Sequence, residues 1–375
     1  MTMNKIRILQ VVGGMNRGGA ETFLMNVLRN IDRNKFEFVF LCYGEKAFDY
    51  ESEINLLGAK IIRTPDVKEV GILKHIKNIA IIIKKERIDI VHAHTYYNSV
   101  FSLIAAKRTM AKVRITHSHN TKSEENPKLV KKLYFYISKF IINIYSTNYF
   151  ACGQDAGKAL FYNKNKFSII NNSIILDDFY YSLITRNQLR KDLGIPEGCT
   201  VILHVGRFDK QKNHYFLVDA YNEYLKINSN SRLVLIGDGI LRDSIENKVI
   251  ELGIQNNVMF LGKRPDVNRL YNIADLFLFP SLFEGFGIVL LEAQANGLTF
   301  LASDVIDQST RLTACAHYCS LSYNAEHWAK QISGLDLKRI NTKEELKNSG
   351  YDMVKNVKAI EHFYDKMLNR KNNNG

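Results

Sequence analysis

The sequence has few of the features that place a protein outside the cell or across a membrane. Its 375 residues include only five cysteines, which form no dense disulfide framework. The first residues do not resemble a signal peptide, because the charged Lys5 and Arg7 interrupt the segment that follows the start. No run reaches the roughly 18 uncharged apolar residues that a spanning helix needs. We therefore expect a protein of the reducing cytoplasm.

Groups that would hold a metal ion are also scarce. The segment from Cys315 to Cys319 is not followed by a second ligand pair with finger-like spacing, so we expect its thiols to pack as small apolar groups. Two H-x-H pairs, at residues 92 and 94 and at residues 117 and 119, lack a carboxylate second shell. The sequence therefore predicts no metal site.

The common nucleotide-binding fingerprints are absent as well. Glycines 13, 14, 18 and 19 follow a predicted strand and precede a predicted helix, where backbone N–H groups and the helix end can hold an anion. Their spacing is neither G-x-G-x-x-G nor that of a P-loop with its Lys-Ser/Thr. Hydride transfer and nucleotide hydrolysis are therefore disfavoured, and a tight turn without a ligand remains an alternative.

Acidic residues are too few in the first half to balance the basic ones. The chain carries a formal net charge of +13, and residues 1–175 hold 27 Lys and Arg against 14 Asp and Glu. The remaining residues hold 24 of each kind. An excess of this kind indicates a polyanion or an anionic lipid surface as a neighbour, although a merely solvated basic surface explains it too.

One segment, residues 131–150, combines aromatic and apolar residues with flanking lysines. Lys139 and Asn143 interrupt it, and Lys128, Lys131 and Lys132 lie at or before its start. The pattern fits a helix lying in a membrane interface. A buried amphipathic helix explains the same pattern, so both interpretations stay open.

Apolar, β-rich segments alternate with segments of helical period along the whole chain, which is typical of βαβ units around parallel sheets. The first series of strands is expected at residues 6–12, 36–43, 59–64, 88–94, 112–119, 148–153 and 167–172. The second series is expected at residues 200–206, 232–239, 258–263, 275–281 and 299–304. The sequence therefore predicts an α/β protein with two doubly wound parallel-sheet domains.

We place the first domain at residues 1–177 and the second at 178–355. A C-terminal helix at 356–375 is expected to pack back toward the first domain. Ligands of open α/β sheets bind at the carboxyl ends of the strands, so the chemistry is expected in a cleft that the two domains face.

Two segments of the second half carry charges suited to such a site. "GRFDKQKN", residues 206–213, follows a predicted strand and offers Arg207 and Lys212, whose charge-assisted contacts to phosphate are worth about 1.5–3 kcal/mol each. "EGFGIVLLE", residues 284–292, begins in a loop and continues into a helix. Its two glutamates, Glu284 and Glu292, are placed to meet the hydroxyls of a sugar and of a ribose.

Seven segments, in this order and spacing, resemble those of the retaining GT-B glycosyltransferases of family 4. They are GGAE (18–21), VHAH (91–94), THSHN (116–120), GRFDKQKN (206–213), LIGDG (235–239), FLG (260–262) and the E-x7-E stretch (284–292). The resemblance spans nearly the whole chain. It implies a GT-B architecture, in which two Rossmann-like domains face a cleft, and it is strongest with enzymes that build capsule or exopolysaccharide repeat units.

The resemblance also implies roles for individual residues. Arg207 and Lys212 would bind the donor diphosphate, Glu292 the nucleotide ribose and Glu284 the transferred sugar. The other implied site residues are Phe286, Gly287 and Ile288, through their backbone groups beside the sugar, His119 beside the reacting carbon, and Gly18 and Gly19 in the glycine loop that faces it. His117 would point to the same side as His119, and we choose His119 because Asn120 follows it as in related enzymes.

The implied activity is that of a retaining hexosyltransferase, with a nucleotide-sugar donor that we expect to be UDP-linked. The expected acceptor is a lipid-linked oligosaccharide, used by a peripheral protein at the inner face of the membrane. No cofactor, catalytic metal or nucleic-acid partner is expected. A nucleotide-sugar 2-epimerase of the same fold remains an alternative, as does a basic nucleic-acid-binding protein, which would not need the E-x7-E pair.

Some positions depart from the family pattern. The usual Asn-Gly-Val-Asp at the domain junction is replaced by residues 171–179, NNSIILDDF, which leaves the hinge uncertain. Thr299 stands where proline is common, and residues 305–313, VIDQSTRLT, replace a glycine-rich turn. Contacts from that turn to donor or acceptor are therefore in doubt.

Overall fold

The computed structural model describes residues 5–16, 18–119, 129–162, 167–284 and 286–372, without the side chains of residues 370–372. It separates into two compact units. Unit 1 comprises Met1–Ser173 and Met353–Gly375, and unit 2 comprises Ile174–Asp352. The chain therefore leaves the first unit, builds the second, and returns to the first.

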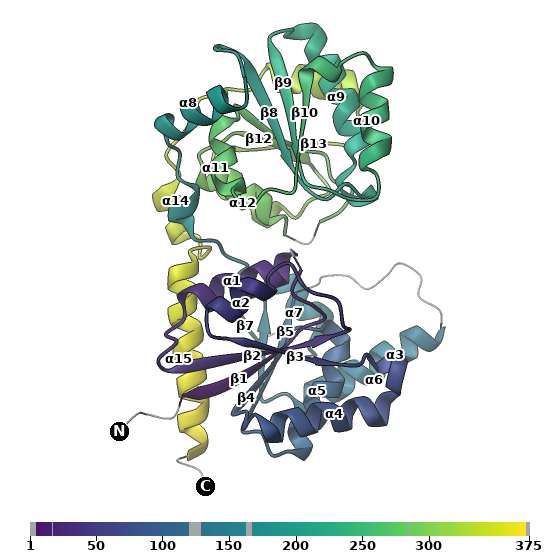
Figure 1. Cartoon of the computed structure of the whole chain (residues 1–375), viewed down its shortest axis with the longest axis vertical. Helices are drawn as coiled ribbons and strands as arrows, with labels where there is room; N and C mark the ends of the chain where they lie inside the picture. Colours follow the sequence, from purple (N-terminus) through teal and green to yellow (C-terminus); the bar gives the residue numbers. More distant parts are fainter. Residues whose placement is uncertain (1–4, 17, 120–128, 163–166, 285, 373–375) are drawn as a thin grey trace. The chain divides into compact units, whose positions relative to one another are not determined.

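The described residues of unit 1 form a seven-stranded parallel sheet in the order β3-β2-β1-β4-β5-β6-β7 (Figure 1). The strands are β1 (Ile6–Val11), β2 (Phe36–Tyr43), β3 (Lys60–Thr64), β4 (Ile90–Ala93), β5 (Val113–Ser118), β6 (Asn148–Ala151) and β7 (Phe167–Ile169). The strand order reverses its direction between β1 and β4. Ligands of open α/β sheets bind at such a switch point.

Helices cover both faces of this sheet (Figure 1). They are α1 (Gly19–Asn30), α2 (Glu51–Leu56), α3 (Val67–Val70), α4 (Ile72–Lys85), η1 (Tyr96–Asn98), α5 (Ser99–Arg108), α6 (Leu129–Tyr145), α7 (Gln154–Leu160) and α15 (Met353–Asn372). Because side chains alternate along a strand, Leu9 and Val11 of β1 pack in one core with α4 to α7. Gln10 points to the opposite face, where α15 packs and the Tyr364 ring lies 5.9 Å from the Phe36 ring, tilted by 57°.

The described residues of unit 2 form a six-stranded parallel sheet in the order β10-β9-β8-β11-β12-β13. The strands are β8 (Thr200–Val205), β9 (Ser231–Ile236), β10 (Val258–Gly262), β11 (Leu276–Phe279), β12 (Phe300–Ser303) and β13 (Ala316–Cys319). Here the order reverses between β8 and β11. The segments that follow these two strands carry the predicted phosphate-binding and E-x7-E residues.

Unit 2 also has helices on both faces of its sheet. They are η3 (Leu176–Phe179), α8 (Leu183–Asp192), η4 (Lys210–Lys212), α9 (His214–Ile227), α10 (Arg242–Glu251), η5 (Gln255–Asn257), α11 (Val267–Leu270), η6 (Tyr271–Ile273), α12 (Ile288–Ala295), η7 (Gln308–Thr310), α13 (Ala325–Ser333) and α14 (Lys343–Asn348). One core packs α8, η6 and α12 against the sheet, and the other packs α9, α10 and α13. Trp328 of α13 is fully buried in the second core.

The predicted α/β class with two parallel sheets is confirmed, and each predicted strand occurs, in most cases shortened at its ends. The sequence analysis missed β13, because Ala-His-Tyr-Cys is short and has no strong β pattern. This strand holds Cys319, Cys315 lies directly before it, and both thiols are free and buried.

The boundaries between the units lie a few residues from residues 177 and 355. Residues 174–177 belong to unit 2, because Ile174 forms a bridge with Asp352 and Leu176 packs in a cluster with Leu291. The helix α15 begins at Met353 and lies against unit 1 (Figure 1). In the described part of the chain, no helix has the length and apolar character that crossing a bilayer requires.

Candidate active site

The basic residues of the site in unit 2 follow β8. The chain passes from Gly206 into the short helix η4, where the side chain of Asp209 accepts a hydrogen bond from the backbone N–H of Lys212 at 3.3 Å. The guanidinium of Arg207 is 71% exposed and lies 3.1 Å from the carboxylate of Asp209. Most of the Arg207 side chain is therefore open to solvent.

Lys212 and Glu284 form an ion pair across 72 residues of sequence. The Lys212 Nζ lies 2.5 Å from Oε1 of Glu284, and the two side chains are only 14% and 8% exposed. The Lys212 ammonium also lies 4.7 Å from the centre of the Phe279 ring, at the end of β11. Strands β8 and β11 are neighbours at the switch point of the sheet, so the fold itself brings the two charges together.

Glu292 lies on α12, whose first residue, Ile288, follows Gly287. Gly287 has φ +67°, a left-handed conformation that glycine adopts without strain. The carboxylate of Glu292 accepts a hydrogen bond from the Tyr271 hydroxyl at 2.8 Å. Burial nevertheless raises the pKa of Glu292 to about 7, because desolvation disfavours the charged form more than this bond favours it.

Two of the residues between the glutamates use their side chains for packing. The Phe286 ring stacks on Tyr351 with 4.8 Å between the centroids, and Ile288 packs in the same cluster. Their side chains are thus used in packing. The first N–H groups of α12 have no partner within the helix, and the start of a helix favours an anion. Gly285 lies outside the described residues.

The glycine loop of unit 1 leads directly into α1. Gly18 caps the helix in an extended conformation, and Gly19 is its first residue. A β-carbon at Gly18 would come 2.4 Å from Oε2 of Glu21, so a larger residue would displace this carboxylate. Burial raises the pKa of Glu21. Lining residues of a nearby cavity of about 360 Å³ include Gly13, Glu21, Asp66, His94, Thr95 and Asn98.

His119 lies just beyond β5 and is held by a chain of hydrogen bonds. Its Nε2 is 2.9 Å from Nδ1 of His94, and Nε2 of His94 is 2.8 Å from Oε1 of Gln10. Nε2 of Gln10 in turn lies 3.3 Å from the Tyr364 hydroxyl, which is also 2.8 Å from Nδ1 of His92. One polar chain therefore connects β1, β4, β5 and α15.

The amide oxygen of Gln10 determines the tautomers of the histidines along this chain. An amide oxygen only accepts, so Nε2 of His94 carries the proton. Burial holds the pKa of His94 well below its usual value, so its ring is neutral and Nδ1 must accept from His119. Burial also lowers the pKa of His119 to about 4. His119 is therefore neutral at pH 7, with its proton on Nε2 and its lone pair on Nδ1.

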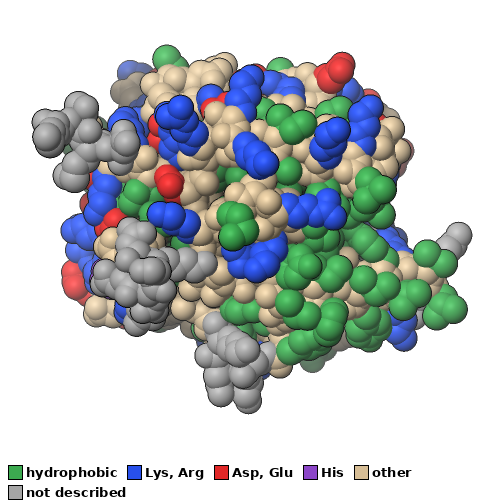
Figure 2. Space-filling view, turned by 90° about the horizontal axis from the view of Figure 1, so that it is seen from below, with side chains coloured by type: hydrophobic (Ala, Val, Ile, Leu, Met, Phe, Trp, Pro, Cys, Tyr) green, Lys and Arg blue, Asp and Glu red, His purple; other side chains and the backbone are tan. Residues whose placement is uncertain are grey.

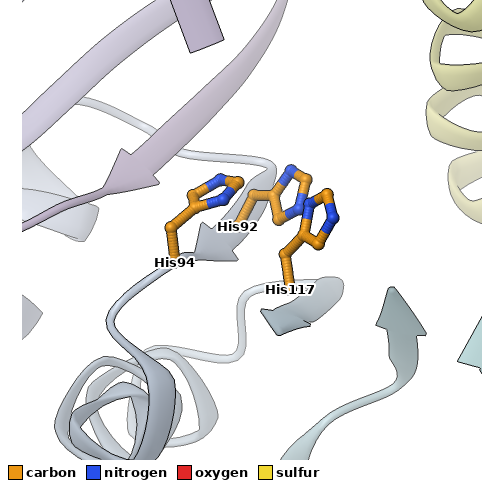
Figure 3. A group of neighbouring side chains, drawn as sticks. All are labelled: His92, His94 and His117. Atoms are coloured by element: carbon orange, nitrogen blue, oxygen red, sulfur yellow. The ribbon is translucent and has the colours of Figure 1, made fainter. Parts of the chain in front are cut away.

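Three histidines, His92, His94 and His117, have nitrogens within 4.8 Å of one another and could in principle hold a metal ion (Figure 3). The group contains no carboxylate. Both nitrogens of His94 are engaged by Gln10 and His119. The rings of His92 and His117 are stacked, with 5.4 Å between their centroids and 6° between their planes. We interpret the group as packed, neutral imidazoles.

The structure thus places the predicted residues in two groups. Arg207, Lys212 and Glu284 lie in the segments that follow β8 and β11, at the carboxyl edge of the unit 2 sheet, and Glu292 lies in α12, which follows them. His119 lies in unit 1, as do Gly18 and Gly19. His117 is buried within β5, and Asn120, on which the choice of His119 rested, lies outside the described residues.

Sequence reasoning missed the partners that hold these groups. Gln10 left a signal, since it is a polar residue in the apolar segment 6–12 that forms a buried strand. Nothing in the local sequence marks Tyr271 or Tyr364, because each contacts its partner only in the tertiary structure. The hydroxyls of both tyrosines bond to side chains that the sequence analysis had singled out, Glu292 and His92.

The link to α15 has a measurable consequence. Tyr364→Phe removes only the hydroxyl and leaves Nδ1 of His92 and Nε2 of Gln10 buried without this partner. We expect the free energy of unfolding of unit 1 to fall by about 1–3 kcal/mol. Urea unfolding measures the change. The exposed Tyr136 on α6 provides the control, and Tyr136→Phe should change stability by less than about 0.5 kcal/mol. Equal effects of the two substitutions would contradict the hydrogen-bond chain.

The architecture of both units together is that of the GT-B fold, as solved structures of glycosyltransferases show. The glycosyltransferase of Rickettsia africae ESF-5 matches with a TM-score of 0.77 at 22% identity, over 97% of this chain and 99% of the other. Anabaena HepE, solved with UDP and glucose, matches with a TM-score of 0.71 at 19% identity, over 95% of this chain and 94% of the other.

Sequence comparison gives the family. The model of the family described as "Glycosyltransferase Family 4" matches residues 17–177. The model of the family described as "Glycosyl transferases group 1" matches residues 185–353. EpsF of Bacillus subtilis (strain 168) is 33% identical over 97% of this chain and 98% of its own length. The chain belongs to the group 1 glycosyltransferases of family 4, and it is a glycosyltransferase of the GT-B fold.

Two further relatives have descriptive names. The capsular polysaccharide biosynthesis glycosyltransferase CapH of Staphylococcus aureus is 27% identical over 81% of this chain and 83% of its own. The Escherichia coli UDP-Gal:alpha-D-GlcNAc-diphosphoundecaprenol alpha-1,3-galactosyltransferase is 27% identical over 64% of each chain. The first of these names refers to capsular polysaccharide biosynthesis, and the second to a sugar carried on diphosphoundecaprenol.

Proposed function

We propose that this glycosyltransferase transfers a hexose, with retention of anomeric configuration, from a UDP-sugar to a lipid-linked oligosaccharide in the synthesis of a capsule or exopolysaccharide. The observation that carries the proposal is the group at the carboxyl edge of the unit 2 sheet. There Lys212 and Glu284 form an ion pair, Arg207 lies in the segment that leads to Lys212, and Glu292 lies in the helix α12 that follows Glu284. Two cations and the start of a helix suit a diphosphate, and two carboxylates suit the hydroxyls of the ribose and of the second sugar joined to it.

The donor is assigned to these groups. Arg207 and Lys212 would hold the diphosphate and stabilise the charge that develops as it leaves. Glu292 would accept from the ribose hydroxyls, and Glu284 would hold the transferred sugar beside the backbone of Phe286, Gly287 and Ile288. The UDP bound by HepE and the UDP-linked donor in the name of the Escherichia coli relative support this assignment.

In the proposed reaction, the bond between the anomeric carbon and the phosphate oxygen breaks, and a bond to the acceptor oxygen forms on the same face of the sugar. The acceptor's proton goes to the departing phosphate oxygen, so no protein nucleophile is required. Glu284 positions the sugar and is charge-compensated by Lys212. His119 is assigned to the place beside the reacting carbon.

The acceptor is assigned to unit 1, which carries the glycine loop of Gly18 and Gly19 and the neighbouring cavity. The cavity is lined by groups that can bond sugar hydroxyls, among them Glu21, Thr95 and Asn98. The name of the Escherichia coli relative includes a diphosphoundecaprenol-linked sugar, which supports a lipid-linked acceptor. Transfer would then occur at the inner face of the cell membrane, with the protein attached peripherally and no nucleic acid involved.

Incubation with a panel of UDP-sugars, alone and with polyprenyl-diphosphate saccharides, tests the proposal. Release of UDP together with a lengthened acceptor is the expected result. A donor that is bound and converted without any acceptor would instead indicate an epimerase of the same fold. Before the assay, protection against heat identifies the sugars that bind, because a ligand of the native state raises its apparent stability.

We further propose that transfer requires no metal ion. Side chains and the start of α12 would neutralise the leaving diphosphate, and His92, His94 and His119 take part in the hydrogen-bond chain of unit 1. Addition of EDTA to the assay should therefore leave the rate within about twofold of the untreated value, since no Lewis acid contributes to the barrier. A loss of most activity that Mg²⁺ or Zn²⁺ restores would contradict this expectation.

A further inference from the structure

The helix α6 has apolar residues on both of its sides. On one side Ile142 is buried, and Tyr134, Phe135, Ile141 and Tyr145 pack against the core of unit 1. The other side carries a stripe of large apolar residues at helical spacing that are between 50% and 81% exposed. They are Leu129, Val130, Leu133, Tyr136, Ile137, Phe140 and Ile144.

The interpretation of residues 131–150 as a buried amphipathic helix therefore describes only one side of α6. A helix that only covered the core would be polar on its outer side. Here the outer side holds two aromatic and five aliphatic residues, each of which is at least half exposed among the described residues. Monomeric proteins rarely expose so continuous an apolar stripe unless it is an interaction surface.

The neighbouring helices extend this surface. Helices α4, α5 and α6 lie side by side on the same face of the unit 1 sheet (Figure 1), and the Tyr134 hydroxyl of α6 bonds Oδ1 of Asn98 at the start of α5. Ile72, Leu73 and Ile81 of α4 are exposed as well. Figure 2 shows the apolar side chains gathered in one patch, with Lys and Arg side chains around it.

The charge of this surface is of one sign. The sequences of α4, α5 and α6 contain no Asp or Glu. Their exposed cations are Lys74, Lys77, Lys84, Lys85, Lys107, Arg108, Lys131 and Lys132. A second copy of the chain would bring like charges together and is disfavoured. Apolar and aromatic side chains bordered by cations, without acids, fit a bilayer surface that contains anionic lipids.

We propose that the outer face of α4, α5 and α6 docks on an anionic membrane, with the α6 stripe inserted at the level of the headgroups. This inference rests on the proposed function in one respect: a lipid-linked acceptor gives the protein a reason to dock on a membrane. The acceptor cavity supports the same arrangement. Asn98, which lines the cavity, is the residue that Tyr134 of α6 contacts.

Sedimentation with vesicles tests the docking. The full chain should bind vesicles of phosphatidylglycerol and phosphatidylcholine, bind pure phosphatidylcholine far more weakly, and lose affinity as salt increases. The triple variant Leu133→Ser, Ile137→Ser, Phe140→Ser should lose at least tenfold in affinity, because it removes apolar area that inserts. A matched control replaces three exposed isoleucines of unit 2, Ile227→Ser, Ile240→Ser and Ile250→Ser, and should bind as the wild type does.

A second pair of variants tests the charges. Lys74→Gln with Lys77→Gln should weaken binding about thirtyfold at low salt, whereas Lys191→Gln with Lys338→Gln in unit 2 should not. All substituted side chains are exposed, so thermal unfolding should be unchanged in each variant. Absence of vesicle binding, or equal losses in test and control variants, would overturn the inference. So would self-association of the free chain that the triple variant abolishes, because the face would then bind a second copy.

Transfer assays separate this inference from the proposed function. The triple variant should keep the wild-type rate on a short-chain, water-soluble acceptor and lose rate on an acceptor embedded in vesicles. Loss on both acceptors alike would overturn the link between docking and acceptor access. If the wild type transfers sugar to neither acceptor yet binds anionic vesicles, the proposed function fails while the docking surface stands.

Discussion

Replacing Lys212 by methionine is expected to lower kcat for sugar transfer by about a hundredfold to a thousandfold, the usual cost of removing a group that stabilises transition-state charge. Glu284→Gln should cause a loss of similar size, because the sugar loses its charged partner. Steady-state release of UDP measures both effects. These substitutions are expected to have the largest effects on catalysis of any single changes in unit 2.

The ion pair also predicts how the substitutions change the free energy of unfolding. This second measurement distinguishes a role in the site from a role in the fold alone. Each single substitution leaves one nearly buried charge without its partner and should cost about 1–3 kcal/mol of unfolding free energy. The double variant Lys212→Met, Glu284→Gln removes both charges and should regain most of that stability. It should remain as inactive as the single variants. Recovery of activity together with stability would show that the pair only holds the fold.

A second ion pair in unit 2 gives the control. Lys248 and Asp219 lie 2.7 Å apart with side chains 21% and 42% exposed, away from the predicted site residues. Lys248→Met should change stability by less than about 1 kcal/mol, because exposed pairs contribute little. Its kcat should equal that of the wild type. A drop comparable to that of Lys212→Met would mean that any lost ion pair in unit 2 impairs transfer.

The second large effect concerns Glu292 and pH. Its pKa in the folded chain is raised from 4.5 to about 7. A raised pKa means that the folded state holds the proton more tightly than the unfolded state does. The stability contributed by this proton is therefore fully present below pH 4.5 and is lost as the pH rises through 7. The loss is roughly 3 kcal/mol at 1.36 kcal/mol per unit of pKa shift.

Glu292→Gln should remove this dependence. The variant and the wild type should have similar unfolding free energies near pH 5, and the variant should be the more stable at pH 8. Urea unfolding of both proteins at the two pH values measures the difference. The exposed Glu251 supplies a control, since Glu251→Gln should change stability by less than about 0.5 kcal/mol at either pH. A constant difference between Glu292→Gln and the wild type across this range would contradict the raised pKa.

The same carboxyl group should couple nucleotide binding to proton release. Ribose hydroxyls donate hydrogen bonds to the ionised form, so binding of UDP should lower the pKa of Glu292. Near pH 7 the complex should then release a fraction of a proton, which calorimetry in buffers of different ionisation enthalpy detects. Glu292→Gln should bind UDP more weakly and release none. Equal proton release by both proteins would assign the proton to another group.

Much of the fold was readable from the sequence because buried parallel strands leave strong local signals. The segments 6–12 and 200–206 are apolar and β-rich, and both form central strands. β13 could not be read in this way, because its four residues have no local pattern that distinguishes a strand. The sequence also could not show which side of α6 stays exposed. Both sides of the helix are apolar, so the tertiary structure decides which one packs on the core.

The sequence could propose residues for the candidate site but not the pairs that they form. Motif positions placed Lys212 and Glu284 in one site, yet only the neighbouring positions of β8 and β11 join them as an ion pair. The tautomer of His119 depends on Gln10, which lies 109 positions earlier in the chain. The spacing of residues along the sequence does not show which side chains meet, or which nitrogen of a histidine carries the proton.

A crystal structure of the chain with UDP bound tests the central claim most directly. The account predicts diphosphate oxygens within about 3.2 Å of the Lys212 ammonium and the Arg207 guanidinium, with the ribose hydroxyls on the Glu292 carboxylate. UDP bound away from these three side chains, with the Lys212–Glu284 pair facing no ligand, would contradict it.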